Sequence, residues 1–360
     1  MSEAGERTNV GSDAQVTADD SNARLFATLG LDRVDPRLAE IVSSGLARVE
    51  DKLLTVVQSD VDFVAEAAQH LVKAGGKRFR PVFTLLCGQF GTEEVTPNTD
   101  DVITAAAAVE LVHLATLYHD DVMDEATMRR GEESVNARWD NTIAILTGDF
   151  LFAHASRLVA DLGSGAARII AETMSVLVTG QMRETVGPSD GDNPVVHYLS
   201  VIAQKTGSLI STAGRYGGMF SGAPDEHIAA LRRYGELIGT AFQISDDIID
   251  IASAATESGK TPGTDLREGV RTLPMLYALS PDALAEPDER LVELLAGPIT
   301  DEALVDEALT LLRKSPALDQ AILTLNEYAD RARAELTVLP DGAARQALDM
   351  LAHYVVARTR

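Results

Sequence analysis

Apolar residues recur along most of this chain at spacings of three and four, the pattern of helices that bury one face. In the first such run, which Pro36 opens, Leu38, Ile41 and Leu46 would lie on one side. The apolar–polar alternation of strands is scarce, and aromatic residues make up only 5% of the chain. The pattern predicts helices over residues 37–57, 61–73, 82–90, 100–124, 135–160, 166–186, 195–221, 224–255, 273–280, 288–296, 301–312, 317–336 and 342–358.

The predicted helices follow one another without a linker rich in Gly, Pro or Ser that would divide the chain. We therefore expect residues 25–360 to form a single all-α domain, a large helical bundle around a central active-site cavity. Residues 1–24 are rich in Ser, Asp, Glu, Gly and Asn and have no apolar core. This composition predicts a disordered polar tail rather than a signal peptide.

The charge balance and the cysteine count narrow the function classes. The chain has 31 Lys and Arg against 55 Asp and Glu, a formal net charge of −24, which argues against binding nucleic acid or anionic membranes. The best candidate for a spanning helix, 102–118, carries Glu110 and His113 and is better interpreted as a buried helix, so no stable membrane anchor is expected. The single cysteine, Cys87, cannot form an internal disulfide, which fits the cytoplasm, and we expect it to be a small core residue.

An acidic cluster ends the apolar run that begins near residue 100. Asp120, Asp121 and Asp124 have the spacing i, i+1 and i+4, which on a helix places Asp120 and Asp124 one turn apart on the same face. Three carboxylates this close repel one another and require a divalent cation, nearby Arg or Lys, or water. Carboxylate oxygens suit Mg²⁺, but such a cluster alone is equally compatible with a solvated surface helix.

A second copy of the spacing favours the metal interpretation. Asp246, Asp247 and Asp250 repeat the pattern i, i+1 and i+4 inside another apolar run. Buried surroundings make free solvation a poor explanation for a second cluster of like charges. Two helices, each ending in an aspartate triad, would be able to face each other across a cavity and hold several metal ions.

Local basic residues are informative in so acidic a chain. The segment Gly-Gly-Lys-Arg-Phe-Arg-Pro at 75–81 places three cations next to flexible backbone, as an anion site near a helix start would. Each basic residue by itself is more typical of a solvated charge than of a ligand. Interleaved with two aspartate triads, the set indicates two phosphate-rich ligands side by side, one bridged by metal and the other held without it. The remaining members of the set are His113, Arg129, Arg130, Lys205 and Lys260.

These motifs resemble, in order and spacing, those of the trans-prenyltransferases, the polyprenyl diphosphate synthases. The segments that carry the resemblance are 75–81, 110–131, 204–207, 242–247 and 259–274. A small departure is Val270, where the family often has Lys, and it puts only a loop contact in doubt. The resemblance implies an all-α isoprenoid synthase fold and Mg²⁺-dependent elongation of an allylic diphosphate with isopentenyl diphosphate.

The resemblance also implies a role for each matching residue. About three Mg²⁺ ions would bridge the allylic diphosphate to Asp120, Asp121, Asp124, Asp246, Asp247 and Asp250. Three cations would add positive charge to the same leaving group: Arg129, Lys205 and Lys260. Isopentenyl diphosphate would be held without metal by Lys77, Arg80, His113 and Arg130. Thr206 and Gln243 would bind and orient the reacting carbons, and the catalytic set is Lys205, Thr206, Gln243, Asp120 and Asp246.

Product length follows from the residues one to two turns before the first aspartate, where the growing prenyl tail would run. Val112, Ala115 and Thr116 are small, which leaves the tunnel open and predicts a product of roughly seven to ten isoprene units. The run 113–122 also resembles the quinone side-chain synthases. In this interpretation Ala115→Phe shortens the product. A bulky residue deeper on another helix would instead close the tunnel at geranylgeranyl length.

Two alternatives share this fold. A class I terpene cyclase has the first aspartate motif but usually lacks the segment 75–81, which is present here. A non-catalytic subunit of a heteromeric synthase needs the fold but typically loses aspartates, and this chain has all six. The resemblance further implies a homodimer, without indicating which face pairs.

Overall fold

The computed structural model describes residues 35–92, 98–252, 262–280 and 288–359, and nearly all of their regular structure is helical, as predicted. The helices are α3 (Pro36–Val56), α4 (Asp62–Lys73), α5 (Phe79–Cys87), α6 (Asp100–Met123), α7 (Val135–Arg138), α8 (Asn141–Asp161), α9 (Ser164–Val186), α10 (Pro194–Ile202), α11 (Ser208–Phe220), α12 (Asp225–Ala252), α13 (Thr264–Glu268), α14 (Leu273–Ala278), α15 (Glu289–Leu294), α16 (Glu302–Lys314), α17 (Pro316–Glu335) and α18 (Ala343–Ala357). A short antiparallel hairpin, β1 (Met128–Arg129) and β2 (Glu132–Glu133), follows α6. The tail predicted over 1–24 lies outside the described residues.

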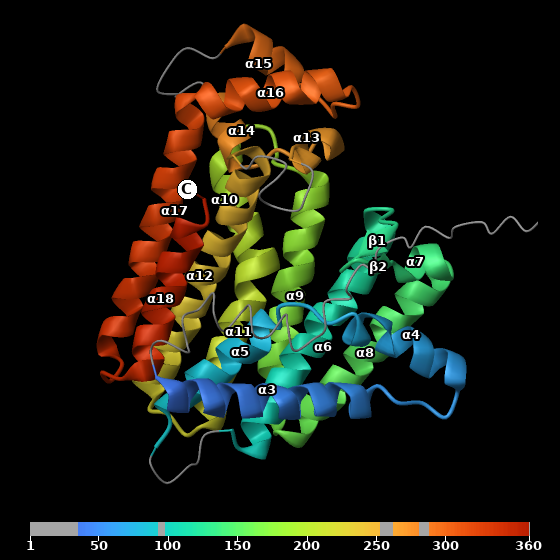
Figure 1. Ribbon diagram of the computed structural model, residues 1–360, viewed down its shortest axis with the longest axis vertical. Helices are drawn as coiled ribbons and strands as arrows, with labels where there is room; N and C mark the ends of the chain where they lie inside the picture. The colour runs from blue at the N-terminus through green and yellow to red at the C-terminus, as the bar shows by residue number, and fades with distance from the viewer. Residues whose placement is uncertain (1–34, 93–97, 253–261, 281–287, 360) are drawn as a thin grey trace, which may run out of the picture.

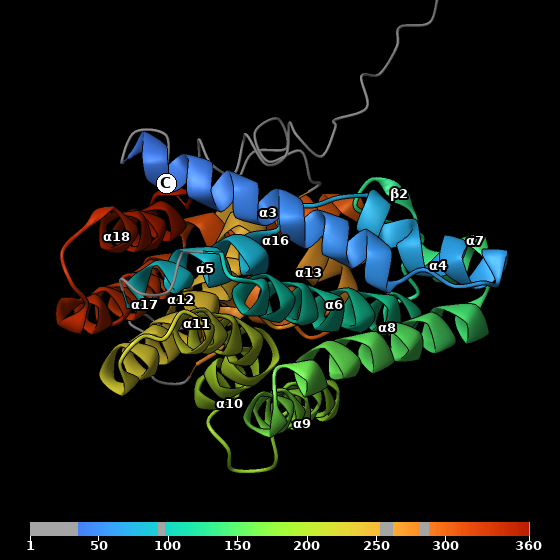
Figure 2. The same cartoon turned by 90° about the horizontal axis from the view of Figure 1, so that it is seen from below.

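Long helices form the body of the molecule, and shorter ones cover its ends (Figure 1). Helix α6 packs chiefly on α8, and α12 packs on α11 and α17. In Figure 1, α3 crosses the lower end of the body, α15 and α16 lie across the upper end, and α17 and α18 run alongside α12. Figure 2, seen from below, shows α8 and α9 at the outer edge of the bundle.

Polar residues just before the helices fix where several of them begin. The carboxylate of Asp35 accepts a hydrogen bond from a backbone N–H in the first turn of α3, and Pro36 occupies the first helical position. Thr99 caps α6 and Asn193 caps α10 in the same way. Each cap satisfies an N–H group that has no partner within its own helix. These starts follow from local sequence, which explains why their predicted positions are close to those observed.

Two predicted helices are interrupted in the structure. The segment expected over 135–160 divides into α7 and α8, because Asp140 caps α8 through the backbone N–H of Ile143. The segment expected over 195–221 contains a π-helical stretch, Ala203–Gly207, between α10 and α11. Such stretches are rare and occur frequently at functional sites.

Helix α6 lies at the centre of the main core. Its residues from Val102 to Val112 are buried almost without exception, so the helix is apolar on every side rather than along one stripe. By length and composition both α6 and α8 are long and apolar enough to cross a membrane, but 78% of the apolar stretch of α6 is buried inside the bundle. The prediction that this segment is a buried helix is confirmed.

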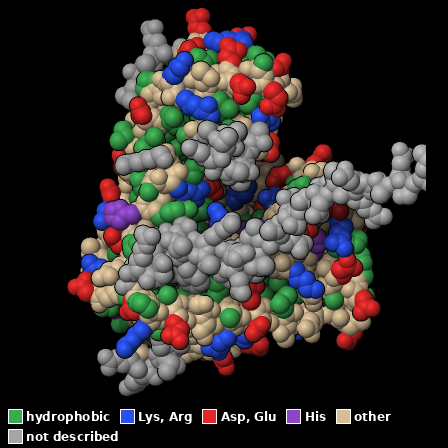
Figure 3. Space-filling view, in the orientation of Figure 1, with side chains coloured by type: hydrophobic (Ala, Val, Ile, Leu, Met, Phe, Trp, Pro, Cys, Tyr) green, Lys and Arg blue, Asp and Glu red, His purple; other side chains and the backbone are tan. Residues whose placement is uncertain are grey.

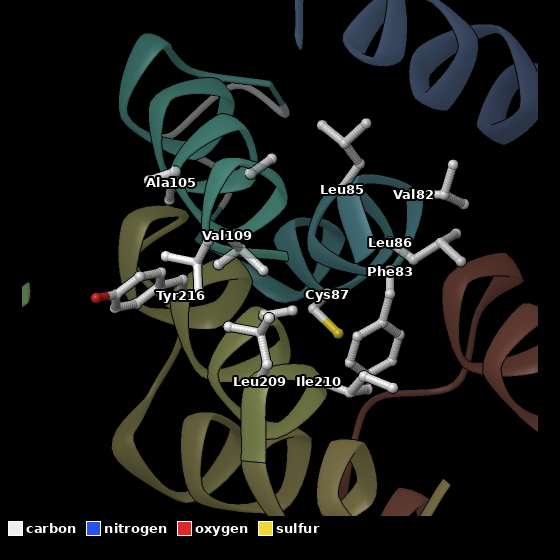
Figure 4. Close-up of a cluster of buried hydrophobic side chains, with 14 of the residues drawn as sticks. Val82, Phe83, Leu85, Leu86, Cys87, Ala105, Val109, Leu209, Ile210 and Tyr216 are labelled. Carbon is white, nitrogen blue, oxygen red and sulfur yellow. The ribbon is translucent and has the colours of Figure 1, made fainter. Parts of the chain in front are cut away.

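Cys87 belongs to the same core, as expected. Figure 4 shows a cluster in which α5, α6 and α11 meet, with Cys87 directed among apolar side chains. The thiol is fully buried, and burial raises its pKa well above the ordinary value. The labelled members of the cluster are Val82, Phe83, Leu85, Leu86, Cys87, Ala105, Val109, Leu209, Ile210 and Tyr216.

Helices α11 and α12 approach closely at two glycines. A Cβ atom added to Gly235 would lie 2.6 Å from the carbonyl oxygen of Ile210, and one added to Gly214 would lie 2.6 Å from that of Leu231. Both distances are shorter than a van der Waals contact between these atoms. The crossing of the two helices therefore depends on the absence of a side chain at these positions.

Gly235→Ala is expected to lower the free energy of unfolding by about 1–3 kcal/mol, because the new methyl group meets backbone that cannot move aside easily. Gly165→Ala in α9 is the matched control, since a Cβ there meets nothing within 4 Å and a helical alanine is favoured over glycine. Urea denaturation of both variants measures the difference. Equal stability of the Gly235 variant and the parent protein would contradict the packing argument.

Candidate active site

A cavity of about 710 Å³ opens between α6, α8, α9, α11, α12 and the start of α5, and its wall has three chemically distinct parts. Asp120 and Asp246 form an acidic part, and Arg80 and Arg130 belong to a basic part beside it. The remainder is mainly apolar. Figure 3 shows Lys and Arg side chains in the recess at the middle of this face. The central cavity expected from the sequence is present.

The first aspartate triad ends α6, and its three carboxylates differ in environment. Asp120 lines the cavity, and its pKa is raised to about 6 because burial disfavours the charged form and Asp124 adds a like charge. Asp121 is fully buried, and its Oδ1 accepts a hydrogen bond from Nε of Arg129 at 2.5 Å. Its Oδ2 has no hydrogen-bond partner, and burial raises its pKa. Asp124 follows as the exposed C-cap.

The second triad lies on α12, and its carboxylates also differ in environment. Asp246 lines the cavity, whereas Asp247 is buried behind it. Oδ1 of Asp247 accepts a hydrogen bond from Nε2 of Gln243 at 3.0 Å, and Oδ2 accepts one from the hydroxyl of Tyr198 on α10. Burial nevertheless raises the pKa of Asp247 to about 7. This carboxylate is therefore positioned by two side chains and carries a costly charge.

Asp250 contacts backbone rather than the cavity. Its Oδ1 accepts a hydrogen bond from the N–H of Thr264 at 3.2 Å, and its Oδ2 accepts one from the N–H of Asp265 at 3.1 Å. These are N–H groups of the first turn of α13, which have no partner within that helix. The aspartate expected among the metal ligands thus anchors α13 to the end of α12 in this structure.

The carboxylates at the cavity fit a divalent cation. Asp121 leaves one buried oxygen without a partner, and Asp120 has a raised pKa, so the site has negative charge that the chain does not neutralise. Among the described residues, no three Asp, Glu, His or Cys side chains converge closely enough to form a complete metal cage. This arrangement suits Mg²⁺, which usually binds one or two carboxylates and completes its shell with water and substrate phosphates.

The π-helical stretch brings Lys205 and Thr206 to the cavity wall. The ammonium group of Lys205 pairs with Glu184 on α9, and the hydroxyl of Thr206 donates to Oε1 of Gln243 at 3.2 Å. Gly180 permits this close approach of α9, because a Cβ there would lie 2.8 Å from the backbone nitrogen of Lys205. Three predicted catalytic residues therefore lie on one stretch of wall.

The basic part of the wall is largely buried, and burial lowers the pKa of its groups. The pKa of Arg80 falls to about 10 through burial and the neighbouring charge of Arg130, and its Nε has no hydrogen-bond partner. Burial and the same guanidinium groups hold the pKa of His113 well below its ordinary value, so the imidazole is neutral. Arg130 donates from Nη1 to the carbonyl of Leu71 at 3.2 Å. A bound anion would stabilise the charged forms of Arg80 and Arg130.

An ion-pair network behind the basic part fixes its geometry. Arg78, in a left-handed conformation with φ 45°, directly precedes α5, which begins inside the segment expected to be a loop. Its guanidinium donates to Oε1 of Glu50 at 2.6 Å and to Oε1 of Glu110 at 3.0 Å. Nη2 of Arg130 lies 3.8 Å from the same Glu110 oxygen. Glu50 and Glu110 thus both pair closely with Arg78. Arg80 and Arg130 therefore retain positive charge that these carboxylates do not fully balance.

The apolar part of the cavity differs from the sequence expectation for chain length. Of the three predicted residues, Thr116 lines the cavity, whereas Val112 and Ala115 are buried in the main core and are not among the lining residues. A helix has 3.6 residues per turn, so the residue four before Asp120 shares its face and the residue five before it does not. The apolar lining comes instead from α6, α8, α9 and α11, with Leu117, Ile145, Phe152, Leu177, Val178, Met182, Leu209 and Ile210.

The structure brings most of the predicted residues to one place. Lys77 lines the cavity with the groups described above, and Arg129 contacts the first triad, while Lys260 lies outside the described residues. Four side chains that the sequence did not indicate hold site residues: Glu50, Glu184, Tyr198 and Arg358. Tyr198 lies two helical turns before Lys205, a spacing that sequence shows. The other three have no local signal.

Comparison with known proteins assigns the family. The polyprenyl synthetase family model matches residues 61–312. The chain belongs to the polyprenyl synthetase family. It is 54% identical over 330 residues to the nonaprenyl diphosphate synthase of Mycobacterium tuberculosis, covering 91% of this chain and 97% of that one.

Solved structures give the same fold. A geranylgeranyl pyrophosphate synthase from Corynebacterium glutamicum, complexed with calcium and isoprenyl diphosphate, superimposes with a TM-score of 0.79 at 49% identity, covering 90% of this chain and 98% of that one. A decaprenyl diphosphate synthase from Rhodobacter capsulatus gives 0.80 at 36% identity, covering 90% and 99%. The isoprenoid synthase fold expected from the sequence is confirmed.

The raised pKa of Asp247 predicts that charge at this site destabilises the ligand-free protein. Its pKa in the folded protein, about 7, lies above the ordinary 3.8. The loss of folding free energy caused by the buried charge is therefore complete above pH 7 and disappears as pH falls toward 4. Asp247→Asn is therefore expected to raise the melting temperature by about 2 °C or more near pH 8, with a smaller gain at lower pH. Thermal unfolding of both proteins from about pH 8 to pH 5 tests this. A lower melting temperature of the variant at every pH would refute it.

Proposed function

We propose that this protein elongates an allylic diphosphate with isopentenyl diphosphate to give an all-trans polyprenyl diphosphate of medium to long chain. The observation that carries the proposal is the single cavity with an acidic wall and a basic wall side by side above an apolar part. Each wall has charge that the chain leaves incompletely neutralised. Two diphosphates, one bound through metal and one bound directly, would neutralise both.

The acidic wall would hold the allylic diphosphate through Mg²⁺. Asp120 and Asp246 line the cavity and, with the exposed Asp124, are the proposed metal-facing carboxylates. Asp121, Asp247 and Asp250, which the resemblance places in the same set, would orient them, because each is hydrogen-bonded by other groups of the chain. About three Mg²⁺ ions per site follow from the resemblance alone.

The basic wall would hold isopentenyl diphosphate. Lys77, Arg80, His113 and Arg130 line one side of the cavity, and the network around Arg78 fixes that side. Guanidinium groups bind phosphate oxygens strongly in a site from which water is largely excluded. With its low pKa, His113 contributes a neutral imidazole that can donate or accept a hydrogen bond.

The reaction would proceed by loss of pyrophosphate from the allylic substrate and attack of the isopentenyl double bond on the resulting carbocation. This forms the new C–C bond and moves the positive charge to the isopentenyl unit. Loss of a proton from the adjacent carbon to the departed pyrophosphate would then restore the double bond. Bound Mg²⁺ would stabilise the negative charge that develops on the departing pyrophosphate. Lys205 would break its ion pair with Glu184 and bind the departing pyrophosphate instead. Arg129 and Lys260 would add positive charge to the same group. Thr206 and Gln243 present oxygen atoms that would orient and stabilise the cation. The apolar remainder of the cavity excludes water from it.

Product length is the property on which related proteins differ most. The Mycobacterium tuberculosis relative makes a nonaprenyl product by name, whereas the Corynebacterium glutamicum structure is a geranylgeranyl synthase. The lining residues Ile145, Val178 and Met182 of α8 and α9 are solvent-accessible, so the cavity is open along these helices rather than closed there by a core side chain. This geometry favours the longer product, and geranylgeranyl diphosphate is the second candidate.

Apolar side chains exposed on α8 and α9 support a homodimer. They are Ile145, Leu146, Val176, Val178 and Met182, and exposed apolar side chains gathered on neighbouring helices are typical of an interaction surface. Pairing of two copies through these helices would bury them. The acidic composition and the single buried cysteine fit the cytoplasm as the compartment.

The proposed activity predicts that the purified chain alone, with Mg²⁺, isopentenyl diphosphate and farnesyl diphosphate, forms a polyprenyl diphosphate. Chromatography of the dephosphorylated product measures its length. Chelation of the metal is expected to abolish product, and Asp120→Ala is expected to lower kcat by at least about a hundredfold. Absence of elongation by the lone chain would instead indicate a subunit that needs a partner.

The cavity lining predicts that substitutions at two neighbouring residues affect different properties, product length and stability. Thr116→Phe places a ring in the cavity and is expected to shorten the product while leaving the protein folded. Ala115→Phe forces the ring into the packed core and is expected to lower the free energy of unfolding by about 1–3 kcal/mol. Product chromatography and urea denaturation of both variants separate the two effects. A shorter product from a fully stable Ala115→Phe variant would instead support the sequence expectation that Ala115 faces the prenyl tunnel.

A further inference from the structure

The end of α18 reaches the acidic wall of the cavity. The guanidinium of Arg358, the C-cap residue of α18, pairs with the carboxylate of Asp246. Its Cζ atom also lies 4.4 Å from the ring centre of Phe242, one turn before Asp246 on α12. The Arg358 side chain is 13% exposed, and its Nη1 has no hydrogen-bond partner. A cation is therefore held against one of the two cavity-lining aspartates.

Packing farther along α18 holds this arginine in place. The hydroxyl of Tyr234 on α12 donates to the carbonyl of Leu348 at 2.6 Å, and Nε of Arg333 on α17 donates to Asp349 at 2.7 Å. Val355, one turn before the end of the helix, is fully buried. The packing of α18 against α12 and α17 thus sets the position of Arg358.

A row of aromatic rings leads from this packing to the arginine. Ring centres are 5.8 Å apart between Tyr234 and Phe83, 6.0 Å between Phe83 and Phe79, and 5.6 Å between Phe79 and Phe242. Arg358 lies over the last ring of the row. Since Phe79 follows the basic segment and Phe242 precedes the second aspartate triad, the arginine is located where the two walls of the cavity meet.

The pair has a direct consequence for metal binding. Asp246 is proposed to bind Mg²⁺, and in the ligand-free protein its charge is already balanced by Arg358. A guanidinium and a metal ion that use the same carboxylate oxygen exclude each other. Asp120 on the opposite side is in a different state, because the cation that acts on it most strongly, Lys205, is itself paired with Glu184.

We infer that Arg358 competes with the metal for Asp246, so that metal binding at the second aspartate triad requires the guanidinium to leave and loosens the end of α18. The inference rests on the proposed metal role of Asp246. By linkage, whatever Arg358 contributes to holding Asp246 must be given up when metal binds, and removal of Arg358 must raise metal affinity by the same factor.

The test uses Mn²⁺ as a probe with the full-length protein and no substrate, with free Mn²⁺ counted by electron paramagnetic resonance. Arg358→Ala is expected to lower the apparent dissociation constant of the tightest site about threefold or more. Arg345→Ala is the matched control, because it removes the same charge from the other end of α18, where Arg345 pairs with Asp341. The control is expected to bind Mn²⁺ as the parent protein does.

A second arm assigns the effect to Asp246. In an Asp246→Asn background the change caused by Arg358→Ala is expected to disappear, since the two residues then have no charge pair to lose. Hydrogen exchange is expected to show that Mn²⁺ accelerates exchange of the N–H groups of Arg358 and Thr359, which close the last turn of α18, in the parent protein only. Thermal unfolding verifies that each variant is folded.

The outcomes distinguish this inference from the proposed function. Equal or weaker Mn²⁺ binding by a folded Arg358→Ala variant overturns the inference and leaves the metal site in place. Persistence of the affinity gain in the Asp246→Asn background also overturns it. If the parent protein binds no Mn²⁺ even with pyrophosphate present, the metal assignment of the proposed function fails and the inference fails with it.

Discussion

Incompletely neutralised charge, held in place by apolar packing, is the constraint on which the site depends. One aspartate of each triad and a group of largely buried arginines line one cavity, although burial disfavours the charge on each of them. The raised pKa of Asp120 and Asp247 and the lowered pKa of Arg80 are the consequence. Such an arrangement persists only because the surrounding helices fix it, and α6, buried on all sides, provides that rigidity.

The chain moderates these charges with ion pairs of two kinds. Arg78 with Glu50 is structural, because the Arg78 side chain is almost fully buried and its two hydrogen bonds to Glu50 hold the start of α5. Lys205 with Glu184 is of the other kind, since Lys205 lines the cavity and a phosphate would compete for it. In the proposed function, binding of substrate and metal would therefore be an exchange of ion-pair partners rather than the filling of an empty site. The net affinity is the difference between two sets of charge interactions.

The product end of the cavity follows different physics. No charge is involved there, and length is limited by which side chains occupy the space between α6, α8 and α9. Ile145, Val178 and Met182 line that end and are solvent-accessible, so it is open to solvent rather than enclosed by the main core. In the proposed function, elongation chemistry and product length would thus be separable, because the first would depend on the charged walls and the second on the apolar lining.

Sequence alone determined the helical class, most helix starts and the residue types of the proposed site. Apolar periodicity and caps such as Asp35 and Thr99 act within a few residues, and the aspartate triads are local patterns that any helix would present on one face. Only the tertiary structure decided which aspartates face the cavity, that Thr116 rather than Ala115 lines it, and that Arg358 reaches Asp246 across 112 residues. These outcomes depend on how helices rotate and cross when they pack, and contacts of long sequence separation leave no mark on the local pattern of residues.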